Sequence, residues 1–393
     1  MAANHTRIDG VVEYMENFDI IIKNGDIADP YAGVWRRGNI GISGRRSAGV
    51  VSDGLEGRIT IDAEGCVVMP GLIDMHTHIF YSGSGISIRP DLLIPMGVTT
   101  TADAGSAGCS NYRAFHDTDI RGSAVRIFSY LNVCSFGQPG HGFQEDLDPS
   151  LYDSGAIREL LEEYPEIRGL KLRIGREIVG ELGLEPLVKT KDLAQKLGVP
   201  IVVHISNPPA PESEVVSILD DGDVFCHCFH GKGDYTIIGH DGRVLPEVIK
   251  ARERGVIFDC ANGFTNYSHR VARASLECGF EPDVISTDLC KTVLEMDGFG
   301  RSLCYVMSKY ISLGMHFRSV VRAVTETPAR ALGMEGRIGT LAPGAAGDVT
   351  ICKIFKARPR YIDNAGGEFY GDTMLTPVMT IKNGEIMYRS EMF

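Results

Sequence analysis

The chain has 393 residues, 44% of them hydrophobic and 23% charged, which is enough for one large domain with a smaller one and excludes a small peptide-binding module. Because 51 acidic residues outnumber 39 basic ones and no Lys/Arg run is present, the formal charge of -12 predicts no nucleic-acid partner. No apolar stretch reaches the roughly 18 residues of a spanning helix, and the polar N-terminus lacks the layout of a signal peptide, so we expect a cytoplasmic protein without membrane contact.

The two ends of the chain share one pattern. After a tail of about 15 residues, residues 17–66 read as short alternating strands joined by Asn-Gly, Gly-Asp and Pro-Gly turns, and the pattern returns over 336–386. Both segments contain the string IKNG, at 22–25 and 381–384, which hints at similar hairpins. We therefore expect residues 1–66 and 336–393 to form one small antiparallel β domain.

Residues 67–335 predict eight strand-helix units, because apolar runs that end in glycine or polar residues alternate with helical periodicity. In one intervening helix Ser154 is expected to be the cap and Pro165 to follow the end, and Gly198 is expected to end another. Eight units match the size of a (β/α)8 barrel, which takes about 250 residues. The expected strands are 67–76, 97–105, 125–134, 167–175, 200–206, 223–229, 256–263 and 283–289.

The ten cysteines lie far apart, most of them inside apolar runs, and we expect them to be reduced and buried. Cys226 and Cys228 form the one close pair, whose spacing is too tight for a C-x2-C metal knuckle. The period of two along a strand sends both thiols away from the face that His227 occupies. We therefore expect them to pack under the helices.

The carboxyl ends of the predicted strands carry the residue types that bind metals, and a parallel barrel has its active site at that end. The H-x-H spacing after the first strand puts two imidazoles on one face. A lone strand histidine is more often structural, but six such residues at five strand ends are hard to attribute to chance. The candidate ligands are His76, His78, Lys171, His204, His227 and Asp288. The lysine needs a separate explanation, because an ammonium repels divalent cations.

These motifs resemble the amidohydrolase superfamily, in its dihydroorotase-like and deacetylase-like branch. The resemblance spans almost the whole chain, and its first and last segments are the most specific. It is carried by PGLIDMHTH (70–78), GLKLR (169–173), VVHIS (202–206), HCFHG (227–231), ISTDL (285–289) and TPARALGM…GTLAPGAAGDV (327–349). The resemblance implies a distorted (β/α)8 TIM barrel with a small composite β domain.

The resemblance also implies a binuclear metal centre. One metal would be held by His76, His78 and Asp288, and the other by His204 and His227. Carbon dioxide would carboxylate Lys171, which would bridge the two metals together with a hydroxide. Zinc is the metal we expect from these ligands, and iron, manganese, nickel and cobalt stay open. Asp288 would carry the proton from the water to the leaving group.

Five further residues are candidates for substrate binding. Arg173 shares the inner face with Lys171 and could hold a carboxylate, or it could form a salt bridge to a neighbouring strand. Ser206, Asn207, Asn262 and His230 follow strand ends at the predicted mouth. The glycine-rich loop 137–143, with His141, is either a lid or a plain connection.

We thus expect a binuclear metal-dependent hydrolase that cleaves an amide or ester bond in a small acyl substrate carrying a carboxylate. N-acyl amino acids and acetylated hydroxy acids are the preferred class. The alternative is a cyclic amidase of the dihydroorotase or hydantoinase type, and a non-catalytic relative is disfavoured by the complete ligand set. The resemblance also suggests a homo-oligomer.

Overall fold

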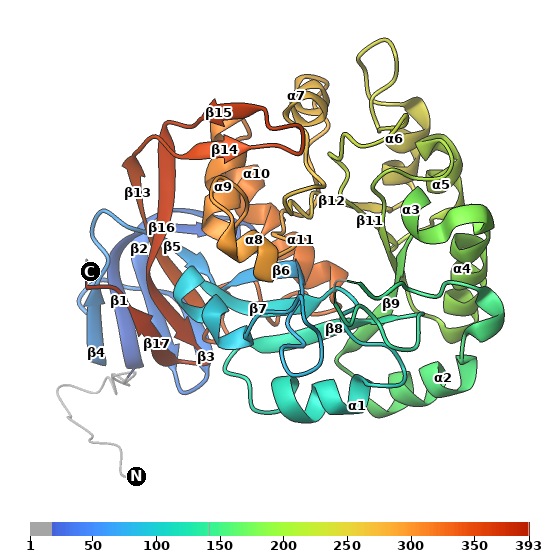
Figure 1. Cartoon of the computed structure of the whole chain (residues 1–393). Helices are drawn as coiled ribbons and strands as arrows, with labels where there is room; N and C mark the ends of the chain where they lie inside the picture. The colour runs from blue at the N-terminus through green and yellow to red at the C-terminus, as the bar shows by residue number, and fades with distance from the viewer. Residues whose placement is uncertain (1–17, 141, 392) are drawn as a thin grey trace.

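The computed structural model describes residues 18–140, 142–391 and 393, and its strands form two large sheets that lie side by side (Figure 1). The first 17 residues, where the sequence predicts a tail, and His141 lie outside the described residues. The sheet at the left of the view combines the two ends of the chain, and the other curves through the middle of the molecule. No helix of the described residues is long and apolar enough to cross a membrane.

Strands from both ends of the chain build an eight-stranded sheet in the order β17-β16-β13-β5-β1-β2-β3, with β4 also paired to β1. The two ends join where β13 runs antiparallel to β5. The expectation of a wholly antiparallel sheet is wrong, because β1 pairs in parallel with both β4 and β5. The strands are β1 (Phe18–Asp29), β2 (Val34–Ser43), β3 (Arg46–Val51), β4 (Gly57–Asp62), β5 (Val67–Pro70), β13 (Val349–Lys356), β16 (Thr373–Lys382) and β17 (Glu385–Arg389).

Two features of this sheet correct the sequence reading. The second IKNG string forms the β16–β17 hairpin, with Asn383 in the left-handed region, but the first lies within β1 at a register shift. The predicted strand 67–76 is two strands, because β5 belongs to this sheet and β6 to the other. Gly71 separates them at a place where a Cβ would lie 2.2 Å from Thr99 Oγ1, so only glycine fits.

The second large sheet has seven parallel strands in the order β12-β11-β10-β9-β8-β7-β6. The order reverses the chain order, so each strand lies beside the next one in sequence, as in a barrel. A separate two-stranded hairpin, β14 (Arg360–Ile362) and β15 (Glu368–Tyr370), lies beside α7 (Figure 1). The barrel strands are β6 (Leu72–Thr77), β7 (Val98–Asp103), β8 (Arg126–Asn132), β9 (Ile167–Arg173), β10 (Ile201–His204), β11 (Val224–Cys226) and β12 (Ile257–Asp259).

The eighth expected strand, 283–289, is not a regular strand. It crosses the gap between the edge strands through two isolated parallel bridges, from Val284 to Asp259 and from Leu289 to Thr77. The physical reason lies at Asp288, whose φ of 53° is left-handed and interrupts an extended ladder. Asp74 connects this segment to β6. Its carboxylate accepts hydrogen bonds from the backbone N–H of Thr287 at 3.1 Å and from the hydroxyl of Thr287 at 2.6 Å.

Helices cover the outside of the curved sheet, as α1, α2, α4 and α5 show in Figure 1. Asp153, rather than the predicted Ser154, caps α2 by accepting from Ala156 N at 2.9 Å. Gly198 ends α4 with a φ of 68°, as predicted. The helices are α1 (Tyr112–Phe115), α2 (Ser154–Glu163), α3 (Arg176–Val179), α4 (Glu185–Leu197), α5 (Glu212–Ile218), α6 (Pro246–Glu253), α7 (His269–Glu277), α8 (Lys291–Glu295), α9 (Leu303–Ser312), α10 (Phe317–Ala323) and α11 (Glu326–Ala331).

Alternation along the strands divides the apolar side chains into two clusters. On β9 and β10, Leu170, Leu172 and Val203 pack outward against helices, whereas Val202 faces inward. The ten cysteines are free thiols, and most of them are buried, as expected.

Candidate metal centre

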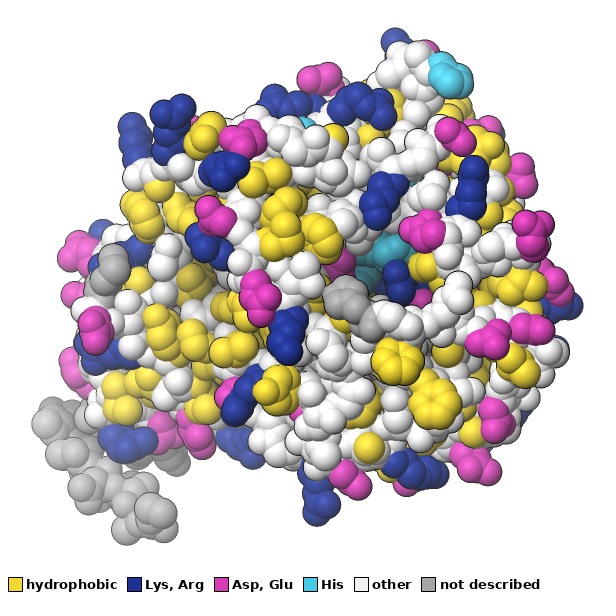
Figure 2. Space-filling model, in the orientation of Figure 1, with side chains coloured by type: hydrophobic (Ala, Val, Ile, Leu, Met, Phe, Trp, Pro, Cys, Tyr) yellow, Lys and Arg dark blue, Asp and Glu magenta, His cyan; other side chains and the backbone are white. Residues whose placement is uncertain are grey.

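The carboxyl ends of the barrel strands surround a hollow in one face of the molecule, and histidine side chains are visible at its bottom (Figure 2). Basic and acidic side chains lie around its rim. The structure brings all six candidate ligands to this end of the barrel. They form two groups, one around Asp288 and one around His227, with Lys171 beside the first.

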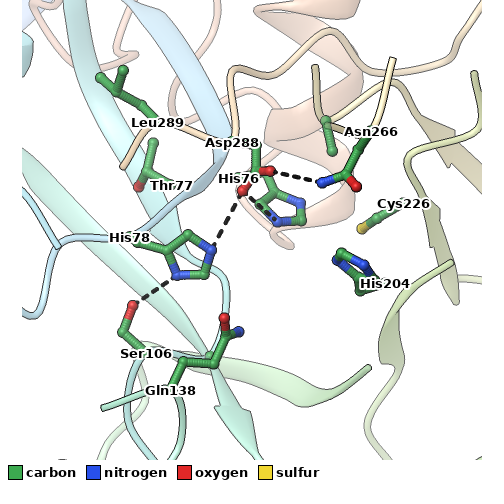
Figure 3. Close-up of polar contacts among 12 residues, drawn as sticks. His76, Thr77, His78, Ser106, Gln138, His204, Cys226, Asn266, Asp288 and Leu289 are labelled. Carbon is green, nitrogen blue, oxygen red and sulfur yellow. Dashed lines mark hydrogen bonds and ion pairs between the residues drawn. The ribbon is translucent and has the colours of Figure 1, made fainter. Parts of the chain in front are cut away.

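His76, His78 and Asp288 form the first group, with potential ligand atoms within 4.8 Å of one another. Both imidazoles point toward Asp288 in Figure 3, and their Nε2 atoms lie 3.6 and 3.4 Å from its Oδ1. The second nitrogen of His78, Nδ1, is 2.9 Å from Ser106 Oγ, which fixes the ring. Asn266 donates to the other oxygen of Asp288 at 3.3 Å. Three potential ligands therefore converge, each with an outer partner or neighbour.

Lys171 is 1% exposed and extends along the inner face of β9 toward His76, whose Nε2 lies 3.4 Å from its Nζ. The stem passes Gly105, where a Cβ would lie 2.5 Å from Lys171 Cγ. Gly105 must therefore lack a side chain for the lysine to reach the centre. Among the described residues no carboxylate pairs with this ammonium, which makes its burial costly as it stands.

His204 and His227 form the second group, and their imidazoles are in contact, with His227 Nε2 2.8 Å from His204 Nδ1. His227 Nδ1 lies 2.7 Å from the carbonyl oxygen of Ala261, so it carries the proton and leaves Nε2 free as a ligand. The rings of His76 and His227 are 5.2 Å apart between centroids, so the two groups adjoin.

Backbone strain is concentrated at this end of the barrel. Asp288, His227, Asn207 and Ala261 adopt positive φ values of 53°, 64°, 55° and 36° although none is glycine. Each such residue costs of order 1–3 kcal/mol and persists where the surroundings hold it. Two of the six candidate ligands, His227 and Asp288, thus have backbone conformations that are unfavourable for non-glycine residues and that the surrounding structure maintains.

Comparison with known proteins identifies the family of the chain. The model of the amidohydrolase family matches residues 67–387, and a deacetylase of Agrobacterium fabrum is 37% identical over 311 residues, which cover 78% of this chain and 75% of that protein. The chain belongs to the amidohydrolase family. A crystal structure of a dihydroorotase superposes with a TM-score of 0.85 at 32% identity, covering 94% of this chain and 99% of that one. A crystal structure of an adenine deaminase superposes with a TM-score of 0.86 at 28% identity, covering 95% of this chain and 100% of that one.

Burial sets the charge state of the histidines in this amidohydrolase. It lowers the pKa of His227 to about 3 and the pKa values of His76 and His204 well below the ordinary value, so all three are neutral and able to bind a metal. Burial acts to raise the pKa of Asp288, but the hydrogen bond to His78 and the neighbouring His76 and His227 outweigh it. The pKa of Asp288 is therefore lowered, and this carboxylate is ionised at neutral pH.

Sequence reasoning missed Asp259, which lies behind His76 at the end of β12. Its Oδ2 is 3.4 Å from His76 Nδ1, and its Oδ1 accepts from Ser286 Oγ at 2.6 Å. A carboxylate behind a ligating histidine fixes the ring orientation and raises its basicity. The available signal was an acidic residue inside the apolar run VIFDC.

The prediction that Cys226 faces outward is wrong. Val224 and Cys226 belong to the inner cluster, and Cys226 Sγ lies 3.9 Å from Asp259 Oδ2. His227 follows the end of β11 with a left-handed φ of 64°, so alternation no longer applies and its side chain also reaches the centre. Cys228 packs outward as expected.

Four of the five predicted substrate-binding residues have protein partners. Arg173 forms a salt bridge at 3.1 Å with the buried Glu145, which lies in the loop after β8 rather than on a neighbouring strand, and Asn207 donates to Glu177 at 2.9 Å. The partners of Asn262 and His230 are Lys309 and Glu212. Ser206 is buried, and its hydroxyl has no hydrogen-bond partner among the described residues. Roles in substrate binding stay predictions for all five.

Proposed function

We propose that this amidohydrolase is a binuclear metal-dependent hydrolase that cleaves an amide or ester bond of a small acyl substrate bearing a carboxylate. The observation that carries the proposal is the convergence of four imidazoles, one carboxylate and one buried lysine at the carboxyl ends of the barrel strands. His204 and His227 contact each other, and His76 Nδ1 faces Asp259 Oδ2 at 3.4 Å without a hydrogen bond, so contacts within the protein do not use all the donors of this centre.

The side chains fit two divalent metals. His76, His78 and Asp288 would hold one, and His204 and His227 the other, which is a nitrogen and oxygen donor set suited to zinc. Lys171 lies beside the first group and has no anionic partner in the part of the chain that the structure describes, and carboxylation by carbon dioxide would turn it into an anionic bridge. When bound, the metals would polarise the substrate carbonyl and lower the pKa of a water molecule, so that hydroxide is available at neutral pH.

The residues of the chain then divide the remaining work. Asp288 is ionised, with Oδ1 toward the two histidines and Oδ2 held by Asn266, so it can accept the proton of the attacking water and pass it to the leaving group. Arg173 offers further N–H donors beside the one that Glu145 accepts, and these suit a substrate carboxylate. Ser206, with its free hydroxyl, is the next candidate for substrate contact.

Deacetylation is the reaction we prefer, because the relative named a deacetylase is 37% identical over most of the chain. Cyclic amide hydrolysis is the second candidate, and the superposition with a dihydroorotase at 32% identity favours it. Cytoplasmic location and assembly into a homo-oligomer stay predictions.

Metal analysis followed by a substrate panel tests the proposal. The protein is expressed with bicarbonate and zinc, its metal content is measured by plasma mass spectrometry, and the same sample is assayed on N-acetyl amino acids, acetylated hydroxy acids, dihydroorotate, hydantoins and adenine. We expect about two metals per chain and turnover of an acetylated acid. Turnover of the cyclic amides alone would select the second candidate, and a folded, metal-loaded protein without turnover would contradict both.

The bridging role of Lys171 has a separate test. We expect Lys171→Ala to lose the metals, whereas Lys189→Ala, the same substitution on the exposed face of α4, retains them. Close to two metals per chain in Lys171→Ala would refute the bridging role of Lys171 without contradicting the roles of the other five ligands.

A further inference from the structure

The loop that follows β12, residues 260–266, contacts both groups of the metal centre. The carbonyl of Ala261 holds Nδ1 of His227 at 2.7 Å, and Asn266 donates to Oδ2 of Asp288 at 3.3 Å. Between them, Gly263 comes so close that a Cβ would lie 2.6 Å from the same carboxylate oxygen. The position of this loop therefore sets the orientation of a ligand in each group.

The loop is strained and is held by the crossing segment on one side. Ala261 and Gly263 have φ values of 36° and 50°. The backbone N–H groups of Asn262 and Gly263 donate to the carbonyls of Ser286 and Thr287 at 3.0 and 2.9 Å, and these two residues directly precede Asp288. A shift of the loop would thus also move the backbone that leads into Asp288.

On its other side the loop is anchored by a lysine. Asn262 is 2% exposed, and its side chain donates to Gly263 O at 3.1 Å and accepts from Nζ of Lys309, on α9. Lys309 is itself 2% exposed and lies over the ring of Tyr267, 3.2 Å from its centroid. In the described part of the chain no carboxylate pairs with Lys309. A buried lysine without an ion pair destabilises the fold, so a role other than stability would explain its presence.

We propose that Lys309 is a positioning residue for the metal centre: through Asn262 it fixes the loop 260–266, and the loop orients His227 and Asp288. The inference rests on the proposed function and adds a residue that touches neither metal nor substrate. Burial lowers the pKa of Lys309 to about 7, and the contact survives the loss of its proton, because the neutral amine still donates a hydrogen bond.

The test is Lys309→Met, which keeps the length of the side chain and removes the donor. We expect kcat to fall roughly 10- to 100-fold with little change in KM, because small displacements of reacting groups have effects of this size. The melting temperature should change little, because removal of the buried amine is offset by the loss of the hydrogen bond to Asn262. Lys309→Gln, which restores a donor, should recover part of kcat.

Lys191→Met is the matched control, because Lys191 is also buried but pairs with Asp223 far from the metal centre. It should lower the melting temperature and leave kcat of the folded protein unchanged. Asn262→Ala, which leaves the lysine in place, should reproduce the kcat loss of Lys309→Met, and the double variant should lose no more than either single one. Asn262→Ala also tests the proposal if Lys309→Met does not fold.

A second readout separates this inference from the proposed function. In protein loaded with cobalt(II), the visible absorption spectrum reports ligand geometry, and we expect Lys309→Met to change it while Lys191→Met does not. This comparison holds even if wild type turns over nothing in the panel, which would contradict the proposed function alone. Wild-type kcat and an unchanged cobalt spectrum in Lys309→Met would show that the lysine is only structural.

Discussion

The two ends of the barrel differ in how some of their buried carboxylates and lysines are paired. At the amino ends, Asp348 accepts from Arg126 at 2.7 Å and from Lys382 at 2.9 Å, and Asp223 binds Lys191 while it accepts from Ile201 N at 2.9 Å. At the carboxyl ends, Lys171 has no anionic partner among the described residues, and Asp259 Oδ2 lies 3.4 Å from His76 Nδ1 without forming a hydrogen bond.

The backbone follows the same division. Of the six non-glycine residues with left-handed φ in the described ranges, four border the metal centre, and the other two, Asn24 and Asn383, are asparagines in the sheet of the chain ends. Asparagine, aspartate and histidine adopt this conformation more readily than other residues, whereas alanine does so rarely, so the strain is clearest at Ala261. The carboxyl ends thus hold strained residues and a buried lysine without an ion pair, and a bound metal pair would use both.

The largest expected effect falls on the carboxyl ends. Asp288→Asn removes the proton acceptor but keeps the shape, so we expect kcat to fall about 10³-fold while the midpoint of urea unfolding changes little. Kinetics on the substrate found in the panel, with circular dichroism as the folding control, measure this. Turnover comparable to that of the wild type would exclude Asp288 as the proton carrier.

At the amino ends the matching change acts on stability instead. Asp348→Ala leaves the buried Lys382 without its carboxylate, and we expect the free energy of unfolding to fall by about 3 kcal/mol, with kcat of the folded protein unchanged. Glu64→Ala, which breaks an exposed pair with Arg37, should change it by less than about 1 kcal/mol. A loss of kcat in Asp348→Ala would mean that the two ends of the barrel are coupled.

This effect depends on pH. Burial acts to raise the pKa of Asp348, but Lys382 and Arg126 outweigh it and lower the pKa below the ordinary 3.8. The stabilisation that ionised Asp348 contributes to the fold is therefore fully present above the ordinary pKa of 3.8. It is lost as the pH falls through the lower pKa of Asp348 in the folded state. The difference in urea midpoint between wild type and Asp348→Ala should shrink in acid below about pH 4, and it should also shrink above about pH 8, because burial lowers the pKa of Lys382 to about 8 and its charge is lost there.

Asp259→Asn tests the carboxylate behind His76. We expect a metal affinity roughly 10- to 100-fold weaker, because the imidazole loses the charge that orients it. Chelator competition measures the affinity, and Asp283→Asn, which removes a carboxylate that pairs with Arg252 at the amino ends, should leave it unchanged. Equal affinities in both variants would show that Asp259 only fills the barrel interior.

The smallest effect concerns strain itself. Ala261→Gly relieves a left-handed alanine, so we expect the free energy of unfolding to rise by about 0.5–1 kcal/mol. The same substitution in a helix, Ala194→Gly on α4, should lower it by about 1 kcal/mol. Urea unfolding of both variants decides this, and a loss of stability in Ala261→Gly would argue that the alanine is not strained.

The sequence predicted those parts of the site that follow strand periodicity. Lys171 and Arg173 share the inner face of β9 because alternation holds along a regular strand. The rule failed where the backbone leaves the extended region. Cys226 was assigned to the wrong face and the segment 283–289 was taken as a strand, because left-handed residues at His227 and Asp288 leave no mark in the periodicity.

Outer partners were harder to predict than ligands. Glu145, Glu212 and Lys309 come from elements distant in sequence from Arg173, His230 and Asn262, so no local spacing links them. Asp259 and Asp74 did leave a trace, since each is an acidic residue within an apolar strand and must find a buried partner there. Burial of a charge in a strand is therefore a better guide to outer partners than spacing.

The junction of the two chain ends has a consequence for synthesis. Strand β5 leads through Gly71 into β6 and the first two histidines, yet its neighbour β13 follows roughly 280 residues later in the chain. At about 5–20 residues per second, the nascent chain displays an unpaired β5 edge for roughly 15 to 60 s. Open edges of this kind promote aggregation. The yield of soluble protein should therefore depend on translation speed and on chaperones that shield β5 until the ribosome releases the C-terminal strands.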